Sequence, residues 1–328
     1  MSRKSAERKH EQTGDAHQKN FVALIKRFSY GHHTHTVFSD FVEMCALSIS
    51  NSVDLKQFEP REKRYLEIIA KYSPTEQALF PQMLGELTLS FEHRVEMMRK
   101  AGGTGVGLAG LTDVLGETYM MLELGNSRAG QFFTPYHVSR MMAMMTIGDG
   151  GPAVREHGFI RVQEPACGAG GMVVAVAESL HDAGHNYQQA MHATCVDIDP
   201  CCVHMAYVQL ALLHIPAVIV HGNALTLDVW GTWYTPAHIL GGWSWKLRRR
   251  EAEAAAAEAI GAVPVEARAP ASAERLDVPE AVEPGIDTEG DVAIAEEIEA
   301  AHAAFDFDVV QAEPSVKLFA KIDQLALF

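Results

Sequence analysis

A short glycine-rich segment, residues 164–171, places the strongest constraint on how this chain can fold. It reads Glu-Pro-Ala-Cys-Gly-Ala-Gly-Gly, follows an apolar, strand-like run at 158–163 and precedes a helical run at 172–180. Glycines in such a turn tolerate positive φ and let a ligand approach the backbone, while the helix start presents free N–H groups. The segment therefore predicts a site for a nucleotide-like ligand, with a purely structural turn as the alternative.

A second segment, one crossover helix later, favours the ligand site. Residues 192–200 read His-Ala-Thr-Cys-Val-Asp-Ile-Asp-Pro, an apolar run that ends in acidic residues. In a βαβ unit that binds a nucleotide, a carboxylate after the second strand accepts hydrogen bonds from the ribose. Asp197 is the candidate for this role. Residues 201–214 then indicate another helix, and residues 217–220 a third parallel strand.

Four segments, taken in order, resemble the motifs of adenine-N6 DNA methyltransferases. They are Gly-Gln-Phe-Phe-Thr-Pro at 130–135, the glycine segment at 164–171, Val-Asp-Ile-Asp-Pro at 196–200 and Gly-Asn-Ala-Leu at 222–225. The resemblance is strongest to the modification subunits of type I restriction systems and covers about residues 105–228. It implies a Rossmann-like class I methyltransferase core with S-adenosyl-L-methionine as cofactor. The spacing alone indicates only a nucleotide-type site.

The resemblance assigns parts of the cofactor to particular residues. Segment 130–135 would cover its methionine end, and Asp197 would bind its ribose. Asn223 stands where the family usually has an aspartate that recognises the adenine amine, and its side-chain oxygen can still accept a hydrogen bond. The expected cofactor-binding residues are Gln131, Phe132, Phe133, Thr134, Pro135, Glu164, Gly168, Ala169, Gly170, Gly171, Asp197 and Asn223.

The family's catalytic motif has no intact counterpart in this chain. Adenine-N6 methyltransferases carry Asn/Asp-Pro-Pro-Tyr/Phe after the fourth strand, where acceptors hold the target amine and the aromatic ring stacks on the flipped base. The nearest segment is Tyr-Thr-Pro-Ala-His at 234–238, so Thr235, Pro236 and His238 are expected to form a degenerate catalytic site. A hydroxyl is a poor replacement for an amide or carboxylate acceptor. We therefore expect weak or absent turnover and a truncated sheet.

The composition changes along the chain and predicts five regions. Residues 1–20 are polar and basic, which favours a disordered tail, and residues 21–104 show helical spacing of apolar positions, which favours an all-helical N-terminal domain. Residues 105–250 form the methyltransferase-like α/β domain. Residues 251–303 are rich in Ala, Glu and Pro and predict a disordered acidic linker, followed by a tail at 304–328.

The last five residues, Gln-Leu-Ala-Leu-Phe, resemble the peptide with which polymerases and repair proteins bind the bacterial sliding clamp. Gln324, Leu325, Leu327 and Phe328 would make the contacts, with an affinity of about 1 μM after the peptide is ordered. The alternative is a tail that folds back onto the protein's own core.

The net charge and the cysteine spacing restrict the partners and the cellular compartment that we expect for this chain. The net charge of -15 disfavours a protein that coats DNA over its whole surface, although basic residues cluster near the N-terminus and at 246–250, where they could contact phosphate. The five cysteines have no paired spacing, which favours reduced thiols in the cytoplasm. No apolar segment indicates a membrane span, and no cysteine and histidine spacing indicates a metal site.

Two functions are compatible with these patterns. The first is an S-adenosylmethionine-binding protein of the adenine-N6 DNA methyltransferase family, of the DNA methylation or restriction-modification type, with DNA as partner. The second is a catalytically inactive methyltransferase fold that serves as a DNA- or protein-binding module at the replication sliding clamp. The two share the cofactor site and differ at residues 234–238.

Overall fold

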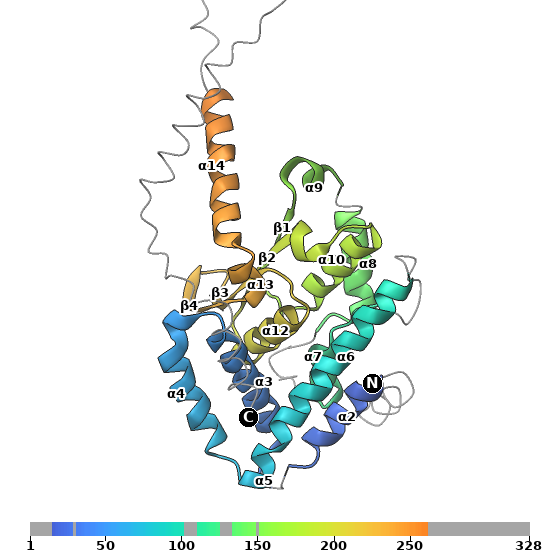
Figure 1. The fold of residues 1–328 in the computed structure, drawn as a ribbon, viewed down its shortest axis with the longest axis vertical. Helices are drawn as coiled ribbons and strands as arrows, with labels where there is room; N and C mark the ends of the chain where they lie inside the picture. Colours follow the sequence, from blue (N-terminus) through green and yellow to red (C-terminus); the bar gives the residue numbers. More distant parts are fainter. Residues whose placement is uncertain (1–14, 29–30, 102–109, 125–132, 149–150, 262–328) are drawn as a thin grey trace, which may run out of the picture. The chain divides into compact units, whose positions relative to one another are not determined.

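The computed structural model describes residues 15–28, 31–101, 110–124, 133–148 and 151–261 (Figure 1). By its contacts the described chain divides into two units, one that ends at residue 252 and one that begins at residue 253. The elements below belong to the first unit, except for the end of the last helix. The expected tail at 304–328 and most of the expected linker lie outside the described residues.

The N-terminal part is helical, as its apolar spacing predicts. Its elements are α2 (Ala16–Ile25), α3 (Thr34–Asn51), the short 3-10 turn η1 (Leu55–Gln57), α4 (Phe58–Ile69), α5 (Pro74–Gln77) and α6 (Leu79–Ala101). Caps set two of the starts: the Asp15 side chain accepts a hydrogen bond from the Gln18 N–H at 2.7 Å, and Ser73 forms a capping box with Glu76. Because α2 begins at Ala16, helix extends into the region expected to be disordered.

Three further helices lead to the sheet. They are α7 (Val114–Met121), α8 (Tyr136–Ile147) and α9 (Gly151–His157). Asp113 caps α7, since its side chain accepts a hydrogen bond from the Gly116 N–H at 2.8 Å. Pro135 precedes α8, where its fixed φ suits a helix start.

The α/β fold expected from the sequence is confirmed. Four strands lie in the order β1 (Ile160–Glu164), β2 (Met191–Asp197), β3 (Ala217–Asn223) and β4 (Asp228–Tyr234). The first three are parallel, with Glu164 opposite Cys195 and Asp197 opposite His221. The connections run through α10 (Gly171–Asp182) with α11 (Tyr187–Ala190), and through α12 (Pro200–Leu212). The carboxyl ends of β1, β2 and β3 therefore meet at one edge of the sheet.

Strand β4 was not expected from the sequence. It returns antiparallel to β3 after a short turn, and the turn residue Leu227 adopts φ 62° although it is not glycine. After β4 follow α13 (Pro236–Leu240) and α14 (Trp243–Gly261), so the expected start of the linker at residue 251 falls inside a helix. None of the described helices is long and apolar enough to cross a lipid bilayer.

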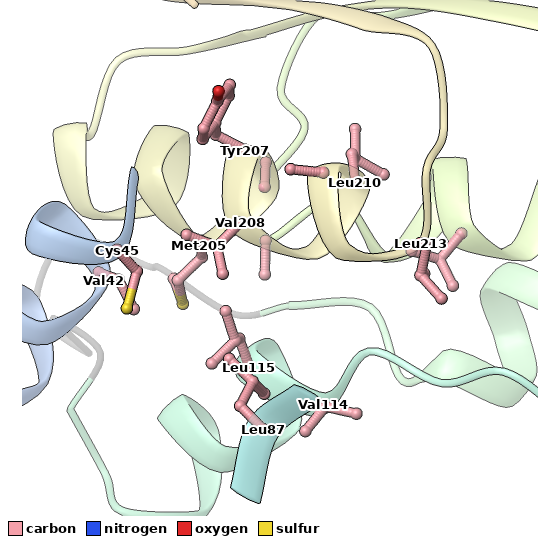
Figure 2. Packing of buried hydrophobic residues seen from close by; sticks show 14 of the residues in the cluster. Val42, Cys45, Leu87, Val114, Leu115, Met205, Tyr207, Val208, Leu210 and Leu213 are labelled. Atoms are coloured by element: carbon pink, nitrogen blue, oxygen red, sulfur yellow. The ribbon is translucent and has the colours of Figure 1, made fainter. Parts of the chain in front are cut away.

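The helical segment and the sheet share one hydrophobic core. Helix α12 is buried on almost all sides and lies between the sheet and the helical part (Figure 1). Figure 2 shows Met205 and Val208 of α12 directed toward Leu115 of α7 and toward Val42 and Cys45 of α3. All five side chains are at most 2% exposed. The sheet is therefore packed, through α12, against the helical part.

Candidate functional site

The glycine turn joins β1 to α10 and has the backbone that its sequence requires. Gly168 and Gly170 adopt φ 53° and φ 89°, in the left-handed region that favours glycine. A Cβ atom at Gly168 would lie 3.0 Å from the ring of Phe133, so a side chain there has no room. The Cys167 N–H donates to the Val196 carbonyl oxygen at 2.9 Å and fastens the turn to β2. Both features fix the path of the chain from β1 into α10.

Asp197, the expected ribose-binding residue, lies at the carboxyl end of β2 beside this turn. Its Oδ2 accepts a hydrogen bond from the Gly168 N–H at 2.8 Å, and its Oδ1 accepts one from the Asp199 N–H at 2.9 Å. Burial raises the pKa of the Asp197 carboxyl, because the charged form is partly desolvated. The next residue, Ile198, is 59% exposed. Asp197 thus holds the glycine turn by its hydrogen bond to Gly168, and the exposed apolar side chain of Ile198 follows it.

A pocket of about 270 Å³ opens at the glycine turn. Its lining comes from the start of α7, from the segment before α8 and α8 itself, and from the turn into α10. The lining residues are Asp113, Phe133, Thr134, Ser139, Met142, Glu164, Ala166, Cys167, Gly168, Ala169, Gly171 and Met172. Two of them are carboxylic acids, and none is lysine, arginine or histidine.

This donor set fits a ligand that carries both a carboxylate and a cation. The first N–H groups of α10 have no acceptor within the helix and favour an anion at the helix start. Asp113 and Glu164 supply negative charge for an ammonium or sulfonium group of the same ligand. Burial, with the charge of Asp197 as a smaller cause, raises the pKa of Glu164. A cation bound in the pocket would lower the pKa of Glu164 again.

Gln209 of α12 connects the pocket to the glycine turn. Its Nε2 donates to Asp113 Oδ1 at 2.8 Å and to the Ala169 carbonyl oxygen at 2.7 Å, while its Oε1 accepts from the Leu115 N–H at 3.0 Å. Gln209 is fully buried, so these bonds fix the start of α7 against the turn. Neither Asp113 nor Gln209 was identified from the sequence as a site residue. The cap of Asp113 on Gly116 is readable from sequence, but the contact with Gln209, 96 residues away, is not.

Most of the cofactor-binding residues expected from the sequence lie together. Phe133, Thr134, Glu164, Gly168, Ala169 and Gly171 line the pocket. Phe133 stacks on Tyr119 of α7, with ring centroids 5.5 Å apart. Pro135 and Gly170 directly precede α8 and α10. Gln131 and Phe132 lie outside the described residues.

Asn223 lies at the same edge of the sheet but is engaged differently from the expectation. Its Oδ1 accepts hydrogen bonds from the Leu225 N–H at 2.9 Å and the Thr226 N–H at 3.4 Å, so it closes its own turn. The acceptor expected to bind the adenine amine is therefore directed into the β3–β4 connection.

The expected catalytic residues Thr235, Pro236 and His238 lie in a filled corner of the fold, unlike the open site expected from the sequence. The Thr235 hydroxyl is fully buried; it donates to the Ile215 carbonyl oxygen at 2.9 Å and accepts from the Ala217 N–H at 2.9 Å. It also caps α13, in which Pro236 is the first residue. In this position the hydroxyl cannot reach a substrate base.

His238 is equally enclosed. It is 3% exposed, its Nδ1 lies 2.8 Å from Nε2 of His192, and its Nε2 lies 2.9 Å from the Ser244 hydroxyl oxygen. Burial lowers the pKa of His238 to about 4, and burial together with the charge on His238 lowers that of His192 to about 3. The ring of Trp243 covers His192 at 5.3 Å. The pair is a neutral structural contact between β2 and α13.

Other described surfaces offer less chemistry. A shallow, wider groove of about 500 Å³ lies on α4 and is lined by Phe58, Leu66, Lys63 and three glutamates. All of its lining residues come from α4, and none belongs to the glycine turn. No cluster of three or more potential metal ligands occurs among the described residues.

Comparison with known proteins gives a family match for the part of the chain that holds the pocket. Residues 111–241 match the model of the family described as N-6 DNA Methylase. No curated protein matches the chain. Among solved structures, the chain is similar to a Listeria monocytogenes crystal structure described as a class I S-adenosylmethionine-dependent methyltransferase, with 14% identity and a TM-score of 0.37. The alignment covers 66% of this chain and 55% of that protein.

The family match spans every element that builds the pocket, from Asp113 through the glycine turn and Asp197 to α13. The pocket independently provides an anion site and two carboxylates, which suit the amino acid and sulfonium groups of the family's cofactor. Residues 111–241 are therefore similar to the N-6 DNA methylase family, and S-adenosylmethionine is the cofactor that this similarity supports.

Proposed function

We propose that this chain binds S-adenosylmethionine as a protein of the DNA adenine-N6 methyltransferase type, and that by itself it transfers little or no methyl group to DNA. The observation that carries the proposal is the contrast between the open pocket at the glycine turn and the fully buried Thr235. DNA as partner, a restriction-modification setting and a cytoplasmic location belong to the same proposal, supported by the family match at 111–241 and by the sequence patterns.

Cofactor binding is supported by the chemistry of the pocket. The methionine part would lie between the start of α10 and the two pocket carboxylates, and the adenosine part would extend along the edge toward Asp197 and Ile198. Asp197 keeps unused acceptor capacity, because each carboxylate oxygen can accept more than the single hydrogen bond described above. When bound, the cofactor would supply an electrophilic methyl group.

The lack of turnover is supported by the state of residues 234–238. A methyltransferase lowers its barrier by holding the target amine in acceptors that are arranged in advance. Here the hydroxyl of Thr235 is used by Ile215, Ala217 and α13, and the His238 ring is used by His192 and Ser244. These groups stabilise the sheet instead of presenting acceptors to a base.

The test combines calorimetry with a transfer assay on unmethylated DNA with labelled cofactor. The wild-type chain should bind S-adenosylmethionine, and Asp197→Ala should weaken binding by about 1.5–3 kcal/mol, as expected for loss of a charged acceptor. The matched control is Glu67→Ala, which removes an exposed acid on α4. No cofactor binding by the wild type would refute the proposal, and robust adenine methylation by the chain alone would refute its second half.

A second candidate function rests on the sequence of residues 324–328. The pattern Gln-Leu-Ala-Leu-Phe supports binding to the bacterial sliding clamp, which would hold the chain close to DNA and raise its effective concentration there. Leu327→Ala with Phe328→Ala should abolish co-elution with the clamp and leave cofactor binding intact. If the double variant unfolds or loses the cofactor, the tail belongs to the protein's own core and clamp binding is refuted.

A further inference from the structure

Asp113 is an acid buried without a counter-ion among the described residues. It is 4% exposed, and its Oδ1 accepts hydrogen bonds only from neutral groups, the Gly116 N–H and Gln209 Nε2, each at 2.8 Å. Burial raises the pKa of Asp113 to about 6, against the opposing effect of these two hydrogen bonds. Burying a carboxylate without a cation is costly, so a position of this kind favours a ligand that brings one.

The second oxygen of Asp113 is directed toward the start of α10. A Cβ atom added to Gly171, the first residue of α10, would lie 2.9 Å from Asp113 Oδ2. Both residues line the pocket, so the Asp113 carboxylate and the helix N-terminus lie close together at its wall. In an amino acid the α-carboxylate and the α-ammonium are attached to one carbon. An anion site and a carboxylate that lie this close together therefore suit the two groups of one amino acid.

We propose that the Asp113 carboxylate binds the α-ammonium group of the cofactor's methionine part, while the N-terminus of α10 binds the α-carboxylate. This assignment rests on the proposed function and specifies how the pocket distinguishes a complete cofactor from a nucleoside. Gln209 acts as a positioning residue, because it holds Asp113 and the Ala169 carbonyl oxygen at the same time.

The decisive variant is Asp113→Asn, compared with wild type by calorimetry at pH 7.5 on two ligands. S-adenosylhomocysteine carries the amino acid, and 5′-methylthioadenosine lacks it. Asparagine caps a helix as well as aspartate and keeps an oxygen for the Gly116 N–H, so the fold should be retained. The affinity for S-adenosylhomocysteine should fall roughly 10- to 100-fold through loss of one charged contact. The affinity for 5′-methylthioadenosine should stay within about twofold.

The matched control is Glu117→Gln, which removes an acid from the same helix, α7, but from a side chain that does not line the pocket. It should leave both affinities unchanged. If Asp113→Asn binds S-adenosylhomocysteine as tightly as wild type, or loses both ligands equally, the assignment is overturned while the proposed function stands. If the wild type binds neither ligand, both are overturned.

A measurement on the wild-type chain alone gives an independent check. Because the ammonium needs the ionised form of Asp113, the affinity for S-adenosylhomocysteine relative to 5′-methylthioadenosine should fall about tenfold between pH 7.5 and pH 5. The other titratable groups facing Asp113 are Glu117, Tyr136, Glu164 and Cys167. In a Glu164→Gln variant, part of this pH-dependent fall in relative affinity should remain. In Asp113→Asn, most of it should disappear. A ratio that does not change with pH in the wild type overturns the assignment.

Discussion

Two strand-to-helix turns of the same sheet differ in how their polar groups are used. In the β1–α10 turn, left-handed glycines leave the first N–H groups of the helix facing a pocket with two carboxylates. In the β4–α13 turn, Thr235 takes the cap position, bonds the neighbouring backbone and fills the space. One turn therefore places the start of a helix at a pocket, whereas in the other the Thr235 hydroxyl is bonded within the fold.

The comparison shows why a strand, a turn and a helix do not by themselves make a site. A helix start at a pocket whose lining has two carboxylates and no basic side chain marks the first turn, whereas a neutral pair of histidines supports the second. Substitutions in the first should change ligand affinity more than stability, and substitutions in the second should do the reverse. The following predictions test this division in order of expected effect.

The largest effect should come from Thr235→Val. Valine has a similar shape but leaves the Ala217 N–H and the Ile215 carbonyl oxygen buried without partners and removes the cap of α13, which should cost about 3 kcal/mol of unfolding free energy. Urea denaturation measures the loss, and cofactor affinity should be unchanged in the folded protein. Thr226→Val, at an exposed hydroxyl bonded to Asp228, is the control and should change stability by less than about 0.5 kcal/mol. A stable Thr235→Val protein that has lost the cofactor would contradict the distinction between a ligand-binding β1–α10 turn and a structural β4–α13 turn.

Gly168→Ala should weaken cofactor binding by about 2 kcal/mol, or roughly 30-fold, because its methyl group would press on Phe133 at the pocket wall. Gly184→Ala is a closely matched control, since Gly184 also has positive φ, 85°, but nothing lies within 4 Å of its added Cβ. Both variants should lose about 1–2 kcal/mol of stability to backbone strain. Calorimetry should show that only Gly168→Ala affects the ligand. Equal loss of affinity in both would show that strain alone matters.

The histidine pair predicts loss of stability in acid. The folded-state pKa values of His192 and His238, about 3 and about 4, lie below the usual 6.5, so below pH 6.5 the unfolded chain binds protons that the folded chain does not. Each histidine should cost about 1.4 kcal/mol of stability at pH 5.5 relative to neutral pH. The raised pKa of Asp113 acts in the opposite direction, so the quantity to measure is the difference in pH slope between wild type and variants.

His238→Gln should reduce the slope of unfolding free energy against pH between pH 6.5 and pH 4.5. The exposed His137→Gln should leave that slope as it is in wild type. An unchanged slope in His238→Gln would show that the pair is not held neutral by burial.

Asn223→Ala should have the smallest effect. Its Oδ1 holds two N–H groups of an exposed turn, so about 0.5–1 kcal/mol of stability should be lost. Cofactor affinity should change by less than about threefold, well below the effect of Asp197→Ala. A loss as large as that of Asp197→Ala would restore Asn223 to the adenine-binding role expected from the sequence.

Local patterns predicted the parallel part of the sheet closely. The apolar runs before Glu164 and Asp197, the glycine turn and the helix that starts at Pro200 were all readable, because each depends on neighbours in sequence. Strand β4 was not, since its turn uses Leu227 at positive φ, where asparagine or glycine is the usual signal. Asp113 and the burial of Thr235 were also missed, because both depend on partners far away in the chain, such as Gln209 and Ile215.

The contact between Arg61 and β4 has a consequence for solubility. Arg61 of α4 donates to the Thr232 carbonyl oxygen at 3.1 Å and bonds Asp54 at 2.8 Å, and its guanidinium lies 4.3 Å from the ring centre of Trp233. Among the described residues β4 is the last strand of the sheet, and outward carbonyls of such a strand can pair with another chain. Because Arg61 bonds one backbone carbonyl of this edge strand with a charged side chain, we expect α4 to disfavour pairing of β4 with another chain.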